Sequence, residues 1–129
     1  MQTFNKEERL SSRKKIDELF SKGRSFNIRP FRVIWMKALP TSNFPAQVLI
    51  TVSRRQYKRA VARNLIKRRI REAYRKNKSP FYDFLNANNA GIVFALVYTS
   101  AVVASYKEIE EKIISILLRL QSEYEKDSG

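Results

Sequence analysis

The strongest constraint on the fold is a stretch of 20 residues, from Tyr57 to Lys76, that contains neither glycine nor proline. It consists mostly of Ala, Arg, Lys, Leu, Ile and Glu, which are acceptable or good helix residues. At about 100° per residue, one sector of such a helix is apolar. It contains Ala62, Ile66, Ile70 and Ala73. We therefore predict a long helix over residues 57–76 that packs this stripe against a core.

A second sector of the same helix is basic. With Arg63 set at zero, it covers about 40° to 140°. We define the basic face as this sector with Arg63 at its border: Arg63, Asn64, Lys67, Arg68, Arg71 and Arg75. Solvated helix surfaces usually mix charges, because like charges four residues apart repel. Four cations of the basic face repeat at that spacing with one sign, so we expect phosphate to compensate them.

The whole chain shares this charge. Its 129 residues include 26 Lys and Arg against 12 Asp and Glu, a formal net charge of +14. Nucleic acid, an anionic membrane and an acidic protein all fit such a charge. A membrane-surface helix needs a broad apolar side, whereas Ala62 and Ala73 contribute little area. We therefore predict a nucleic-acid partner, with no membrane partner and no small-molecule substrate.

The composition also limits the chemistry. The chain has no cysteine and no histidine, so it lacks thiolate metal ligands and the commonest general base. An autonomous metal-dependent nuclease would need converging carboxylates. The acidic clusters instead lie near the ends or on a predicted surface helix: Glu7 and Glu8; Glu108, Glu110 and Glu111; Glu123 and Glu125. We expect no catalytic residue and no metal site in the protein.

No targeting or membrane segment is recognisable. The first ten residues include acids and no apolar signal region. No apolar run approaches the roughly 20 residues of a membrane span. We expect a cytoplasmic protein.

The first half of the chain indicates one helix followed by strands. Residues 11–22 predict a short amphipathic helix that begins at Ser11 or Ser12. Gly23 is expected to end it with a left-handed backbone. The β-rich runs 31–38 and 46–53 predict two antiparallel strands, with a short extra pairing around 25–28.

The second half adds a strand and a helix to the basic helix. Residues 77–89 contain Pro80 and several asparagines, which predicts a loop. The apolar run 91–98 predicts a buried strand, and 105–122 a second amphipathic helix. Residues from Tyr124 onward are expected to form a polar tail. Together the elements indicate one α+β domain over 1–129, with an ordered core over about 8–122.

Residues 51–75 closely resemble the signature of the bacterial ribonuclease P protein subunit. The core of that signature is Arg63-Asn64, Ile66-Lys67-Arg68, Arg71-Glu72-Ala73 and Arg75. The resemblance extends to residues 10–23 and to the order of elements through residue 120. Two positions differ. Leu65 stands where the family commonly has a basic residue, and Gln56-Tyr57 where many members have a glycine.

The resemblance implies a fold and a function. The implied fold is a small, mostly antiparallel sheet with three helices in α-β-β-β-α-β-α order. It includes a left-handed β-α-β crossover, against the general preference. The implied protein is a subunit of a ribozyme, in which the RNA subunit holds the catalytic Mg²⁺. That enzyme cleaves precursor tRNA and releases its 5′ leader.

The resemblance also assigns site residues. Those implied to face the catalytic RNA are Arg59, Arg63, Asn64, Lys67, Arg68, Arg71 and Arg75. Those implied for a leader cleft between the first helix and the sheet are Arg13, Lys14, Ile16, Phe20 and Ile34. Side chains alternate along a strand, so either Arg32, Ile34 and Met36 or Phe31, Val33 and Trp35 can line this cleft. The sequence leaves that choice open.

Two further alternatives remain open. Phe20, Phe31, Trp35 and Tyr57 can each stack on an unpaired base or fill the core. A ribosomal or other structural RNA-binding protein is the nearest alternative function. Ribosomal proteins often carry disordered basic extensions, whereas both ends of this chain contain acids, which favours the ribonuclease P subunit.

Overall fold

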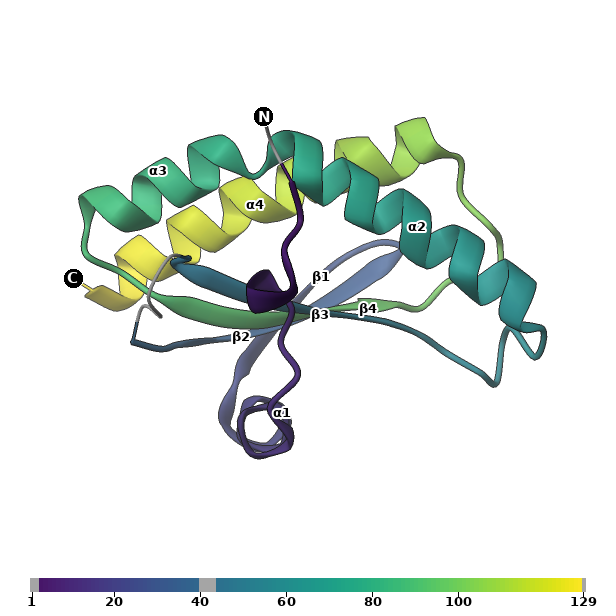
Figure 1. Cartoon of the computed structure of the whole chain (residues 1–129), viewed down its shortest axis with the longest axis horizontal. Helices are drawn as coiled ribbons and strands as arrows, with labels where there is room; N and C mark the ends of the chain where they lie inside the picture. Colours follow the sequence, from purple (N-terminus) through teal and green to yellow (C-terminus); the bar gives the residue numbers. More distant parts are fainter. Residues whose placement is uncertain (1–2, 40–43, 129) are drawn as a thin grey trace.

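The computed structural model describes residues 3–39 and 44–128. One layer of helices covers a sheet, and a separate helix lies on the opposite face (Figure 1). The elements are the 3₁₀ helix η1 (Lys6–Glu8), α1 (Arg13–Lys22), β1 (Arg24–Ile28), β2 (Phe31–Lys37), β3 (Ala46–Val52), α2 (Ala60–Asn77), α3 (Ser79–Ala87), β4 (Ile92–Tyr98) and α4 (Tyr106–Ser128). The α+β class and the strand expected around 25–28 are confirmed.

The sheet places its last strand between earlier ones. Its order is β1-β2-β4-β3, with β2 antiparallel to β1 and β4, and β3 parallel to β4. The runs 31–38 and 46–53 form strands of opposite direction, as predicted, but they are not paired with each other because β4 lies between them. The β4 strand is apolar throughout because both of its faces are covered. The connection from β3 through α2 and α3 to β4 is a β-α-β crossover, whose left-handedness stays a prediction.

The main core lies between the sheet and the layer formed by α2, α3 and α4. Val33 and Trp35 of β2 point into it, as does Phe94 of β4. The predicted stripe of α2 is confirmed, because Ile66, Ile70 and Ala73 are fully buried and Ala62 packs at the margin. Tyr74 is also fully buried, a position that the apolar stripe had not included.

Residues 79–87 form a helix where the sequence predicted a loop. Pro80 lies in the first turn of α3, where the missing N–H is not needed for a helical hydrogen bond. Phe81 and Leu85, four residues apart, are both buried. The proline therefore begins a helix, and the described residues form four α-helices instead of the predicted three.

The predicted polar tail is also wrong, because α4 continues to Ser128. The ring of Tyr124 lies 6.3 Å from those of Trp35 and Phe84. Asp127 forms ion pairs with Arg24 at 2.5 Å and Lys37 at 3.1 Å. These partners belong to β1, β2 and α3, so local sequence could not reveal them. Gly129 lies outside the described residues.

The short helix α1 begins and ends at the predicted residues, but its glycine acts differently. The Ser12 hydroxyl accepts a hydrogen bond from the Lys15 N–H at 3.3 Å, as an N-cap does. Gly23 has φ −69° and ψ 156°, which is not left-handed. A Cβ there would lie 2.5 Å from the Leu19 carbonyl oxygen and 2.8 Å from Ile34 Cγ2. The close approach of α1 to β2 therefore requires glycine.

Candidate RNA interface

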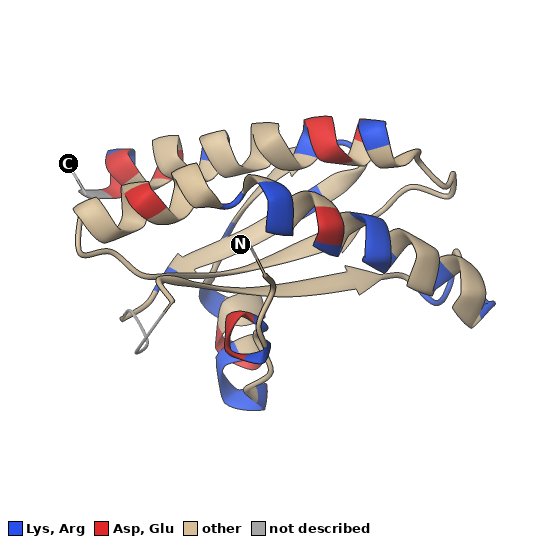
Figure 2. Cartoon of the chain, turned by 45° about the horizontal axis from the view of Figure 1, so that its top comes forward, with Lys and Arg blue, Asp and Glu red and all other residues tan. Residues whose placement is uncertain are grey.

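The central part of the basic face of α2, around Arg71, lies on the side away from α4. On the α4 side, the Arg69 guanidinium donates to the Ala104 carbonyl at 2.6 Å, and Lys76 Nζ lies 5.8 Å from the Tyr106 ring centre. Arg71 instead lines a hollow beside β3. The predicted separation of Arg69 from Arg71 is confirmed. Basic residues recur along α2 and around α1 (Figure 2).

In the described part of the chain, five of the seven residues implied to face the catalytic RNA have neither an ion pair nor a hydrogen bond from their side chains. Arg59, Asn64 and Arg68 are exposed, and Lys67 and Arg71 are half-buried. Within residues 3–39 and 44–128, no carboxylate pairs with the four cations of this group. Partial burial and then the neighbouring charge of Arg9 lower the pKa of Arg71. These side chains can accept phosphate without breaking a native ion pair.

The other two residues, Arg63 and Arg75, have structural partners. Arg63 Nη1 donates to the carbonyls of Tyr57 at 2.6 Å and Lys58 at 3.0 Å, which fixes the loop before α2. Arg75 donates twice to Glu72, at 2.6 Å and 3.1 Å. This pairing raises the pKa of Arg75 and lowers that of Glu72. Both arginines lie where predicted, but part of their donor capacity is already used.

Only one of the four aromatic candidates for base stacking is exposed. Phe31, Trp35 and Tyr57 are buried in the main core, whereas 48% of Phe20 is exposed. The Tyr57 hydroxyl donates to the Ser100 carbonyl at 2.8 Å. Tyr57, one of the two residues that stand where many family members have a glycine, therefore anchors the loop before α2 to the segment after β4.

On the other face of the sheet, α1 packs over β2 and β4. Leu19 and Ile34 are buried in this contact with Ala95, and Ile16 packs at its margin. The choice between the two strand sets is thereby decided. Ile34 and Met36 face α1, whereas Val33 and Trp35 face the main core.

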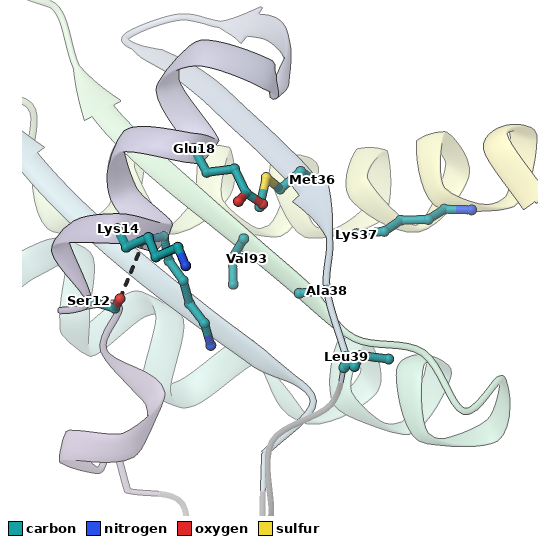
Figure 3. Close-up of a pocket in the computed structure, with 9 residues that line it drawn as sticks. Ser12, Lys14, Glu18, Met36, Lys37, Ala38, Leu39 and Val93 are labelled. Atoms are coloured by element: carbon teal, nitrogen blue, oxygen red, sulfur yellow. Dashed lines mark hydrogen bonds between the residues drawn. The ribbon is translucent and has the colours of Figure 1, made fainter.

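A hollow of about 460 Å³ opens along one flank of α1. Lys14 and Glu18 extend from α1 beside Met36 and Val93 of the sheet (Figure 3). The complete lining is Ser12, Lys14, Lys15, Glu18, Met36, Lys37, Ala38, Leu39 and Val93. Three lysines and one carboxylate, Glu18, thus border an apolar floor, and the lysines and floor together suit an unpaired nucleotide.

The residues implied for the leader cleft do not share one surface. Lys14 lines the hollow, whereas Ile16 and Ile34 lie in the contact beneath α1. Phe20 lies about 140° around the helix from Lys15, and Arg13 lies within about 20° of Phe20. Arg13 and Phe20 therefore occupy the opposite flank of α1, and both are exposed. On this face of the sheet, α1 therefore separates two surfaces, one along each of its flanks.

The carboxylates are dispersed, and several of them have structural partners. In the described part of the chain, no three acidic side chains come close enough to hold a metal ion. Glu8 pairs with Lys78, Glu110 accepts from Asn77 and Tyr106, and Glu123 lies near Arg119 and Lys126. None of the described helices combines the length and the apolar character needed to cross a bilayer.

Comparison of the sequence with known proteins places this chain in a family. The sequence model described as Ribonuclease P matches residues 4–121. The ribonuclease P protein component of Porphyromonas gingivalis is 30% identical, over 91% of this chain and 85% of that protein. That of Petrotoga mobilis is 32% identical, over 94% of this chain and 98% of that protein.

The chain belongs to the ribonuclease P protein family. It is the protein subunit of ribonuclease P, a ribozyme holoenzyme that processes the 5′ ends of tRNA, and its partner is the ribonuclease P RNA. Solved ribonuclease P proteins share the fold. The Staphylococcus aureus protein aligns with a TM-score of 0.67 and 22% identity, covering 88% of this chain and 94% of that one. The Thermotoga maritima protein aligns with a TM-score of 0.67 and 24% identity, covering 87% and 96%.

Proposed function

We propose that the basic face of this ribonuclease P protein binds the catalytic RNA, while the α1 side of its sheet binds the 5′ leader of precursor tRNA. The observation that carries this proposal is the separation of two cationic surfaces by one sheet. The basic face lies on the helical layer, and α1 lies on the opposite face of the sheet (Figures 1 and 2). Two RNAs can therefore bind at the same time.

The chemistry of the basic face suits the backbone of a folded RNA. Arg68 and Arg71 can each bind a phosphate with two parallel donors, and Lys67 adds a point charge. Such contacts fix the position of an RNA without reading its sequence. Asn64 is exposed and both donates and accepts, so it can meet a ribose or a base edge. Leu65 supplies no charge, and the contact made there by many relatives is absent.

The flanks of α1 suit a single strand. Unpaired bases stack on exposed aromatic rings while cations track the phosphates. Phe20 is the exposed ring on one flank, and Arg13 lies two turns before it on the same side of the helix. Lys14 and Lys15 border the hollow on the other flank. A leader that follows the Phe20 flank gains both stacking and charge.

A competition experiment tests the separation of the two surfaces. The protein is bound to labelled RNA subunit, and a single-stranded RNA with a leader sequence is added in excess. We expect a ternary complex, with the RNA subunit still bound. Stoichiometric displacement of the RNA subunit by the leader would show that both use one surface.

A second experiment concerns catalysis. Protein freed of RNA should cleave no precursor tRNA, because its carboxylates are dispersed. Added to the RNA subunit, it should lower the Mg²⁺ concentration needed for cleavage, because its cations replace counterions around packed phosphates. Cleavage by RNA-free protein that is lost on substituting a carboxylate would contradict the assignment of catalysis to the RNA.

A further inference from the structure

The segment before α1 runs along the edge strand β3. It descends from the helical layer past the sheet to α1 (Figure 1). Arg9 forms a parallel bridge with Val48, and the Leu10 N–H donates to the Val48 carbonyl at 2.9 Å. The side-chain amide of Gln47 donates to the Glu7 carbonyl at 3.1 Å. These contacts make the segment a short extension of the sheet.

A buried charge network fixes this segment. The Glu8 side chain is fully buried and forms an ion pair with Lys78 at the junction of α2 and α3. The same carboxylate accepts from the Tyr82 hydroxyl at 2.7 Å and from the Asn5 N–H at 2.7 Å. Removing one partner of a buried ion pair leaves an uncompensated charge, so such a network holds its residues firmly. The neighbouring residue, Arg9, is therefore held at a defined place.

Arg9 and Arg71 line the same hollow, although one comes from the segment before α1 and the other from α2. The hollow measures about 220 Å³, and its other lining residues are Phe4, Leu10, Ser11, Val48, Leu49 and Ile50. The Arg9 guanidinium lies 5.2 Å from the ring centre of Phe4, and this ring packs edge-on against Tyr74 at 5.7 Å. In the part of the chain that the structure describes, neither arginine has an ion-pair partner.

We propose that Arg9 and Arg71 bind one RNA phosphodiester between them, at the sheet edge where the basic face meets the α1 side. This inference rests on the proposed function and extends the RNA surface to the segment before α1. Two like charges that share a hollow repel each other, and a bound anion reverses that cost. Guanidinium groups match phosphate with paired donors. The Ser11 hydroxyl lines the same hollow and can add a donor.

The test compares Arg9→Ala with Lys6→Ala. Lys6 is an exposed cation of the same segment that does not line the hollow. Affinity for the RNA subunit is measured over a series of salt concentrations. We expect Arg9→Ala to weaken binding about tenfold and to reduce the salt slope by about one, with Lys6→Ala close to wild type. Arg9→Lys should keep the slope and lose part of the affinity, because it keeps the charge and loses the paired donors.

Two further measurements sharpen the result. If both arginines hold one phosphate, the double variant Arg9→Ala/Arg71→Ala should lose less affinity than the two single losses combined. The same variants are then tested as holoenzymes on leader-bearing and mature tRNA. A loss on the RNA subunit alone assigns the phosphate to that RNA, and a loss only on leader-bearing substrate assigns it to the leader.

Either of those losses supports the site. Unchanged affinity of Arg9→Ala in both assays, in a protein that melts like wild type, would overturn it. Purely additive losses for the two arginines would overturn the shared phosphate. The proposed function has a separate criterion, because Arg68→Ala should weaken RNA-subunit binding whatever Arg9 does.

Discussion

The two proposed RNA surfaces carry charge of the same sign but are supported in different ways. On α2, the basic face stands on four fully buried residues, Ile66, Ile70, Ala73 and Tyr74. On α1, Leu19 is the one fully buried side chain of the helix. The first surface is therefore a rigid array of cations at fixed spacing, suited to a folded RNA. The second is a short helix with open flanks, suited to a strand of variable sequence.

The largest expected effect comes from removing the support of α1. Leu19→Ala deletes a fully buried side chain, and we expect the free energy of unfolding to fall by about 2–5 kcal/mol. Thermal or urea unfolding measures the loss. Leu118→Ala is a matched control, because that leucine is 61% exposed on α4 and its loss should leave the midpoint nearly unchanged. If Leu19→Ala also melts like wild type, α1 has a support other than the one described.

The next effect separates the two RNAs. Phe20→Ala should lower affinity for leader-bearing precursor tRNA by about 1–3 kcal/mol, because the leader loses one stacking partner. Affinity for mature tRNA and the melting temperature should hardly change, since 48% of Phe20 is exposed. A sharp drop in melting temperature, with equal losses for both RNAs, would make Phe20 a structural residue.

A smaller effect tests the orientation of α2. Arg63→Ala, Lys67→Ala and Arg71→Ala should each weaken binding to the RNA subunit and reduce its salt slope by about 0.9, one phosphate contact each. Arg69→Ala is the matched control, because Arg69 points away from the basic face toward the segment before α4, where it donates to the Ala104 carbonyl. Equal losses of salt slope for Arg69→Ala and Arg71→Ala would show that the basic face is assigned to the wrong side of α2.

The smallest effect distinguishes the flanks of α1. Lys15→Ala removes a cation from the rim of the hollow, and we expect leader affinity to fall by less than it does for Phe20→Ala, by about 0.5 kcal/mol or less. Binding of a fluorescent leader RNA at low salt measures the difference. A loss larger than that of Phe20→Ala would place the leader in the hollow instead of along the Phe20 flank.

The sequence predicted best what depends on neighbours along one helix. The stripe of Ile66, Ile70 and Ala73 follows from helical periodicity alone, and so does the separation of Arg69 from Arg71. The same periodicity predicts the basic face, whereas the family resemblance supplies the function, Arg59 and the residues of the leader cleft. The resemblance implies that Ile34 lines the leader cleft, but the structure buries this residue beneath α1.

What the sequence missed depends on contacts between distant segments. Pro80 and the nearby asparagines predict a loop from local sequence, whereas α3 is stabilised by the burial of Phe81 and Leu85 in the main core, where Phe81 packs against Phe94 of β4. The position of Arg9 depends on the pair formed by Glu8 and Lys78, which are 70 residues apart. No local pattern marks this pair, because Glu8 is the only carboxylate that is buried in the described part of the chain.

The place of β4 has a consequence for the synthesis of the protein. A nascent chain that ends before Ile92 contains β2 and β3 but not the strand that lies between them. The entropic cost of closing such long loops must be met before the strand contacts can form and stabilise the sheet. Because β4 lies between β2 and β3, the sheet can assemble only when about three quarters of the chain has left the ribosome. Because α1 and α2 both pack on β4 or its neighbours, the two proposed RNA surfaces are completed at the same stage of synthesis.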